Sequence, residues 1–237
     1  MNCLGDCAYN PAAVKALLAI VQSNLGQKLI MAATGVALFA FVFQHMIGHL
    51  IMFAGADAYN TYAGEMQALR FKWPARLALL VAVALHILAA VSLTRRNRAA
   101  RPEAYAKNKN TGASLSSRTM IVSGFLLAAF IVYHILHFTI GVTHPEVFAL
   151  EDRFGRHDVY TGMLRAFEDP RLVAMYLAAM ALLCMHLAHG VASFLRTLGL
   201  MNERFRKAEE RFSVASAALV FIGFASVPLA IVLGILR

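Results

Sequence analysis

The chain has 237 residues, of which 59% are hydrophobic and 15% are charged, whereas an ordinary soluble domain has about 25% charged residues. This composition excludes a soluble globular protein and predicts an integral membrane protein. The net charge of +9 would suit a nucleic acid partner, so the distribution of the charges has to be considered.

Five apolar runs follow one another along the chain, and each is long enough to cross a hydrocarbon core of about 30 Å as a helix. Residues 1–27 precede them as a cytoplasmic arm, in which residues 14–25 predict a short amphipathic helix at the membrane surface. The connections are too short for a second domain, so we expect one all-α membrane domain over residues 28–237, a bundle of five transmembrane helices. The predicted spans are residues 29–53, 75–94, 119–142, 172–196 and 212–236.

The basic residues are distributed unequally over the two sides of this bundle. The side of the N-terminus carries fourteen Lys or Arg and five Asp or Glu, whereas the other side carries eight basic and eight acidic residues. Because positively charged loops stay in the cytoplasm, we expect the N-terminus inside and the C-terminus outside. The charge excess then serves as a topology signal facing anionic lipid or a soluble partner subunit, and nucleic acid is not an expected partner.

The histidines are the candidate metal-binding or cofactor-binding residues of this sequence. Seven of the nine histidines lie within the apolar runs or at their ends. Ionisable groups at membrane depth are costly and usually face a bundle interior or a cofactor, and neutral imidazole is a common metal ligand. The seven are His45 and His49 in the first run, His86 in the second, His134 and His137 in the third, and His186 and His189 in the fourth.

Four of these histidines, one from each of the first four runs, fall at two depths. A helix rises about 1.5 Å per residue, which places His45 and His134 both ~12 Å below the outer surface of the hydrocarbon core. The same estimate places His86 and His186 roughly 12–15 Å from the inner surface. The spacing therefore predicts two histidine pairs, one above the other across the bilayer.

A pair of imidazoles suits the two axial positions of a haem iron, whereas zinc or copper needs a third or fourth protein ligand. His49, His137 and His189 lie three or four residues from a paired histidine, so spacing alone leaves a zinc or copper site open. The five runs contain no carboxylate that could balance a bare dication, which favours two haems b.

A haem edge also needs small residues beside it and polar partners for its propionates. The candidate small residues are Gly35, Gly48 and Gly190, and the remaining imidazoles expected at the haem edge are those of His49, His137 and His189. The propionate partners considered are Lys28, Arg98 and Arg118 on the inner side, and Arg76, His144 and Tyr160 on the outer side.

Several motifs, spread over helices and loops, carry a family resemblance. They are KLIMAATG at 28–35, QHM at 44–46, GADAYN at 55–60, NRAARP at 97–102, SRTM at 117–120, YHILHFT at 133–139 and HLAHG at 186–190. With these motifs the chain resembles, nearly end to end, the cytochrome b558 membrane-anchor subunits of succinate dehydrogenase and fumarate reductase.

The resemblance implies a five-helix anchor in the cell inner membrane with two haems b, joined to a flavoprotein subunit and an iron–sulfur subunit. It implies His45 and His134 as ligands of the outer haem, and His86 and His186 as ligands of the inner haem. His186 is preferred to His189 because the family's ligand lies thirteen residues before the glycine that matches Gly199. Two positions depart from the family: many relatives have Asn at position 49, and some have a proton-carrying glutamate at position 184, which is Cys here.

The function implied is electron transfer from succinate oxidation in the partner subunits to a quinone, with menaquinone as the expected one. The candidate residues for the quinone site are Glu65, Tyr59 and Trp73 in the first outer loop. The sequence has no nucleotide loop or catalytic triad, and Cys3, Cys7 and Cys184 form no cluster, so we expect no catalysis without the partners. The alternatives are a di-haem anchor of another quinone-linked dehydrogenase and a non-redox transporter with polar histidines.

Overall fold

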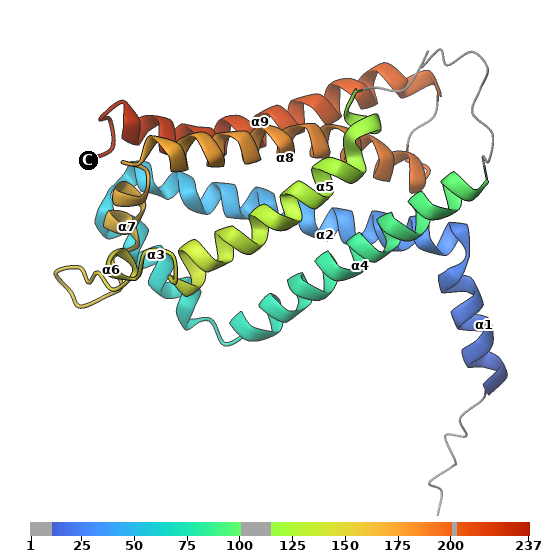
Figure 1. The fold of residues 1–237 in the computed structure, drawn as a ribbon, viewed down its shortest axis with the longest axis horizontal. Coiled ribbons are helices and arrows are strands. Elements are labelled where there is room, and N and C mark those ends of the chain that lie inside the picture. Colours follow the sequence, from blue (N-terminus) through green and yellow to red (C-terminus); the bar gives the residue numbers. More distant parts are fainter. Residues whose placement is uncertain (1–10, 101–114, 201–202) are drawn as a thin grey trace, which may run out of the picture.

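The computed structural model describes residues 11–100, 115–200 and 203–237, and these residues form helices joined by short connections (Figure 1). Five helices are long and apolar enough to cross a membrane, which confirms the five predicted spans and the all-α class. They are α2 (Asn24–Leu50), α4 (Lys72–Ala99), α5 (Leu115–His134), α8 (Pro170–Thr197) and α9 (Arg206–Val232). A 3-10 turn, η1 (Ile51–Ala54), continues α2, and a π-helical turn, η2 (Ile135–Ile140), continues α5.

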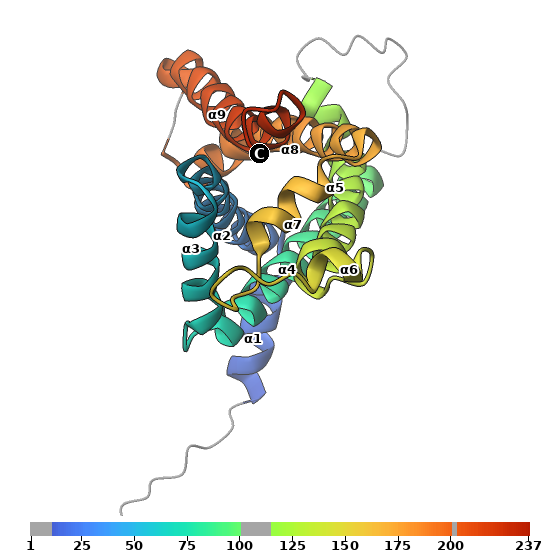
Figure 2. The ribbon, with the colours of Figure 1, turned by 90° about the vertical axis from the view of Figure 1, so that its left-hand side faces the viewer.

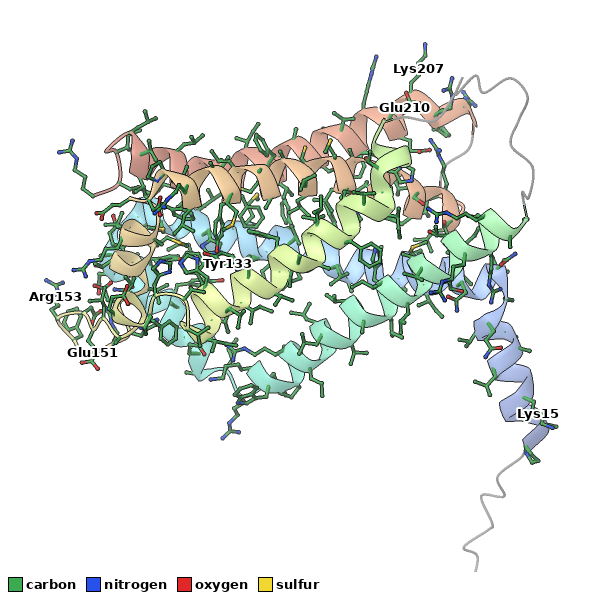
Figure 3. The ribbon with its side chains drawn as sticks, viewed as in Figure 1. Lys15, Tyr133, Glu151, Arg153, Lys207 and Glu210 are labelled. Atoms are coloured by element: carbon green, nitrogen blue, oxygen red, sulfur yellow. The ribbon has the colours of Figure 1, made fainter. Side chains whose placement is uncertain are left out.

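Shorter helices lie at both ends of this bundle. At one end, called the α1 end, are α1 (Pro11–Gln22) and the 3-10 turn η3 (Glu203–Phe205). At the opposite end, called the α7 end, α3 (Ala56–Ala68), α6 (Pro145–Phe148) and α7 (Val159–Ala166) gather beside the C-terminus (Figure 1). The labelled charged side chains lie at these two ends rather than along the middle of the bundle, as a membrane protein requires (Figure 3).

Most helix boundaries differ from the predicted ones by several residues, and for two of them the cause can be identified. The helix predicted over residues 14–25 ends at Gln22, because the Ser23 hydroxyl accepts a hydrogen bond from the Gly26 N–H and so begins α2. The last helix ends at Val232 rather than at residue 236, because Gly234 takes a left-handed conformation with φ of 69°. The connections that were predicted as outer loops contain the helices α3, α6 and α7, which hydropathy does not mark because they lie outside the apolar runs.

Four helices surround a common interior, and the fifth lies against two of them. Helix α2 contacts α4 and α8, α8 also contacts α5, and α4 meets α5, whereas α9 packs along α8 and α2. Figure 2 shows this arrangement from the α7 end, with α7 lying across it. Helix α9 approaches α2 at Gly223, where a Cβ atom would collide with the buried side chain of Met46. Small residues thus set the close approach of the helices.

A buried asparagine ties the segments of the α7 end together. Asn60 of α3 is 2% exposed, and its Nδ2 donates to Asp158 Oδ1 over 2.9 Å. Its Oδ1 accepts from the Tyr160 N–H over 3.0 Å. The Arg156 guanidinium makes ion pairs of 2.7 Å with Asp57 and with Asp152 beside this contact. These bonds hold α3 against the segment that contains α7.

Replacing Asn60 by alanine is expected to lower the free energy of unfolding by about 2–3 kcal/mol, because the buried Tyr160 N–H loses its acceptor and the Asp158 carboxylate loses one of its donors. Thermal unfolding of the detergent-solubilised chain measures this change. The exposed Asn97, replaced in the same way, should leave the midpoint within the error of the wild type. Equal midpoints for the two variants would contradict the role given to Asn60.

Acid should loosen the same region. Burial alone would raise the pKa of Asp158, but hydrogen bonds from Thr161 and Asn60 outweigh it and hold the pKa below the ordinary value of 3.8. A carboxylate with a lowered folded-state pKa contributes stability at pH values above its unfolded pKa and loses it as the pH falls through the folded value. We therefore expect the hydrogen-exchange protection of residues 145–169, corrected for the intrinsic exchange rate at each pH, to stay constant from neutral pH to about pH 4 and to fall below that. Asp158→Asn should flatten this dependence, and an unchanged pH profile in that variant would refute the assignment.

Candidate functional site

The structure brings the four predicted histidines together as the two predicted pairs. The ring centroids of His45 and His134 are 5.8 Å apart. Those of His86 and His186 are 6.4 Å apart. Each pair joins two helices that lie diagonally opposite each other across the common interior, α2 with α5 and α4 with α8.

The spacing of each pair fits one metal ion between two imidazoles. A metal–imidazole bond of about 2 Å, with the bonding nitrogen about 1.2 Å from the ring centre, places the two ring centroids about 6 Å apart. Thr34, which lies beside His86, and His45 are eleven residues apart on α2, so the two pairs are separated by about 16 Å along the helix. The pairs therefore define two separate sites.

Both pairs line one elongated cavity of about 1850 Å³ inside the bundle. This volume is nearly twice the ~1,000 Å³ of a large ordinary ligand pocket. The lining is mainly apolar and extends along α2 from Lys28 to His49, about 31 Å of helix. The cavity thus offers room for two flat apolar ligands placed one after the other along the bundle axis.

The ligand set favours two protein ligands per metal ion. In residues 11–100, 115–200 and 203–237, no group of three or more His, Cys, Asp or Glu side chains is arranged to hold a metal ion. A zinc or copper site would need such a group. A porphyrin needs only the two imidazoles, because its own nitrogens supply the remaining ligands.

His49 lies next to the pair at the α7 end. Its Nε2 is 3.2 Å from His45 Nε2, and its Nδ1 is 2.8 Å from the hydroxyl of Tyr59. His49 also lines the cavity, whereas Tyr59 is buried behind it, where burial raises the pKa of the phenol. The predicted quinone residue Tyr59 therefore lies against a histidine of the cavity wall.

His137 lies on the other side of this pair, in the π-helical turn η2. It is buried, and its Nδ1 is 2.9 Å from the Tyr176 hydroxyl, which also lies 3.5 Å from His134 Nδ1. The His144 ring is 5.0 Å from the His137 ring, centroid to centroid. His137 is thus joined to His134 through Tyr176.

The predicted residues of the cofactor edge fall in different places. Lys28, Gly35, His189 and Gly190 line the cavity, and so does Arg76. Arg98 is exposed on the last turn of α4, and the side chain of Arg118 lies outside the described residues, as do Cys3 and Cys7. Gly48 makes room for the Tyr62 side chain, because a Cβ atom would lie 2.7 Å from its hydroxyl oxygen.

Of the remaining quinone candidates, Trp73 lines the cavity and Glu65 does not. Trp73 is 69% exposed and lines the cavity, with the Arg76 guanidinium 5.2 Å from its ring centroid. Glu65 is exposed on α3. Trp73 and Arg76 thus combine an aromatic face with a cation in the cavity wall near the α7 end.

Sequence reasoning missed several polar residues around the cavity. Arg196, at the end of α8, lines the cavity beside an ion pair with Glu209, which makes it a further cation at the α1 end. The hydroxyls of Thr34 and Ser123 lie 3.1 Å and 3.4 Å from Nδ1 of His86 and His186. The available signal was a hydroxyl residue followed by glycine, at 34–35 and at 123–124, in two runs that supply cavity walls.

Comparisons with protein-family models, curated proteins and solved structures returned no match to this chain.

Proposed function

We propose that the chain is the membrane-anchor cytochrome b subunit of a succinate:quinone oxidoreductase, placed in the cell inner membrane with its N-terminus in the cytoplasm. The observation that carries the proposal is the presence of two histidine pairs, at 5.8 Å and 6.4 Å, along one apolar cavity in a bundle of five membrane-length helices. The motifs that resemble cytochrome b558 anchors support succinate as the substrate of the complex and fumarate as the product of its oxidation.

His45 with His134, and His86 with His186, would each hold one haem b through their neutral imidazoles. Haem b supplies one-electron transfer when it is bound. The mainly apolar lining of the cavity suits the faces of a porphyrin, and a neutral imidazole offers a lone pair to iron. Lys28 and Arg196 at the α1 end and Arg76 at the α7 end provide cations for propionates.

The two ends of the bundle would serve different partners. Exposed basic residues gather at the α1 end, where they suit anionic lipid and the iron–sulfur subunit that docks there with the flavoprotein: Arg95, Arg96, Arg98, Arg204 and Arg206. The α7 end, with Trp73 and Arg76, would bind the quinone. Succinate oxidation in the flavoprotein releases two electrons and two protons, and the quinone takes up two of each to become the quinol.

The test is the haem content and the partners of the purified full-length chain. We expect about two haems b per chain in the dithionite-reduced minus oxidised spectrum, and copurification of subunits that oxidise succinate in the presence of menaquinone. A chain without haem would overturn the proposal and favour a transporter. A chain with two haems that copurifies with a hydrogenase or formate dehydrogenase instead would identify another quinone-linked anchor.

A further inference from the structure

The pair of histidines nearer the α1 end has a feature of its own, a matching polar contact on each ring. Thr34-Gly35 of α2 lies against His86 of α4, and Ser123-Gly124 of α5 lies against His186 of α8. A Cβ atom added at either glycine would lie 3.5 Å from Cε1 of the adjacent imidazole. The imidazole rings therefore rest directly on the backbone of the neighbouring helix, with a hydroxyl beside Nδ1.

The hydroxyl protons of Thr34 and Ser123 are donated to backbone carbonyl oxygens of their own helices. Thr34 Oγ1 donates to the Ile30 carbonyl oxygen over 2.7 Å, and Ser123 Oγ donates to the Met120 carbonyl oxygen over 3.1 Å. A hydroxyl has one proton to donate but two lone pairs to accept with. Toward the imidazole, each hydroxyl therefore acts as an acceptor, and the histidine Nδ1 must be the donor.

The direction of these bonds selects one tautomer for each ring. With the proton on Nδ1, the unprotonated nitrogen of His86 and of His186 is Nε2, the nitrogen that is left to bind a metal. Both hydroxyls are shielded from water, because Thr34 is 9% and Ser123 3% exposed, so water does not replace them as acceptors. An acceptor on Nδ1–H also raises the basicity of a ligating imidazole and holds its ring orientation.

Resting on the function proposed above, we infer that Thr34 and Ser123 are positioning residues that fix the Nδ1–H tautomer of His86 and His186 and thereby tune this haem site alone. The pair at the α7 end has different neighbours, since Tyr176 and His49 contact its rings. The two sites thus differ in the groups that hold their ligands, although each uses two histidines.

The test compares Thr34→Val, which keeps the side-chain shape without the hydroxyl, with Thr34→Ser, which keeps the hydroxyl. Loss of a ligand's hydrogen-bond partner weakens metal binding by about 10–100-fold. In the full-length chain in detergent we expect Thr34→Val to increase the transfer of one haem to apomyoglobin by this factor. The midpoint potential of the same haem should shift upward, because a less basic imidazole stabilises ferric iron less.

Ser123→Ala should act on the same haem in the same direction, with a smaller effect because its contact is longer. Ser213→Ala is the matched control, since the Ser213 hydroxyl is buried and donates to the Glu209 carbonyl oxygen over 2.8 Å in the same way, but on α9. The second haem reports in every variant whether the bundle is folded, and Thr34→Ser should restore wild-type values.

The outcomes separate this inference from the function on which it rests. If the wild-type chain binds no haem, the proposed function fails. If it binds two haems and Thr34→Val leaves both potentials and both transfer rates unchanged, only the inference fails. A shift of both haems together in Thr34→Val would also overturn it, because that result indicates a general structural defect.

Discussion

Replacing His86 by alanine is expected to halve the haem content of the purified chain, from about two per chain to one, and to remove one of two steps in a redox titration. The reason is that His86 and His186 face each other without a third histidine, cysteine or carboxylate arranged with them in the described residues. The pair His45–His134 lies about 16 Å away along α2 and should keep its haem.

The control for this experiment is His157→Ala, which removes an exposed histidine of the α7 end. It should retain both haems and both redox steps. His45→Ala should leave one haem as well, but with the other redox step missing. A His86→Ala protein with two intact centres would refute the pairing of His86 with His186.

The second large effect concerns stability at the α1 end. Glu209 of α9 is 2% exposed, and its Oε1 lies 2.6 Å from Nε of Arg196 on α8, off the N–H direction, so that charge attraction rather than an aligned hydrogen bond joins them. Arg196→Met is expected to lower the free energy of unfolding by about 3 kcal/mol, because it leaves a buried carboxylate without its cation. Thermal unfolding in detergent measures the loss.

Two further variants isolate the cause of that loss. Arg206→Met changes the exposed pair of Arg206 with Glu210 and should cost less than about 1 kcal/mol. The double variant Arg196→Met with Glu209→Leu should recover most of the stability, since an apolar pair of similar size carries no buried charge. A double variant as unstable as Arg196→Met would show that the ion pair is not the source of the effect.

Much of the helical architecture follows from hydropathy and helical rise alone. The five apolar runs become the five long helices, and the depth estimate correctly groups His45 with His134 and His86 with His186. This succeeds because an uninterrupted helix converts sequence spacing directly into depth, and because each of the first four runs has a histidine at a matching height.

The contacts around these histidines do not follow from spacing in the same way. Whether Thr34 faces His86 depends on the rotation of α2 relative to α4, which packing of small residues such as Gly35 decides. The role of the buried Asn60 at the α7 end is equally unpredictable from the sequence, because its hydrogen-bond partner Asp158 is ninety-eight residues away. Long-range polar contacts of this kind have no local periodicity that predicts them.

The π-helical turn η2 changes the direction in which side chains point at the end of α5, so that residues before and after it face different neighbours. An i to i+5 turn accommodates one extra residue, which rotates everything beyond it by about 100° relative to a continuous α-helix. His134 ends the regular part of the helix and contacts His45, whereas His137, within the turn, is directed to Tyr176. One transmembrane segment can therefore keep a metal ligand in register with its neighbours while its far end adapts separately to the surface where it leaves the bilayer.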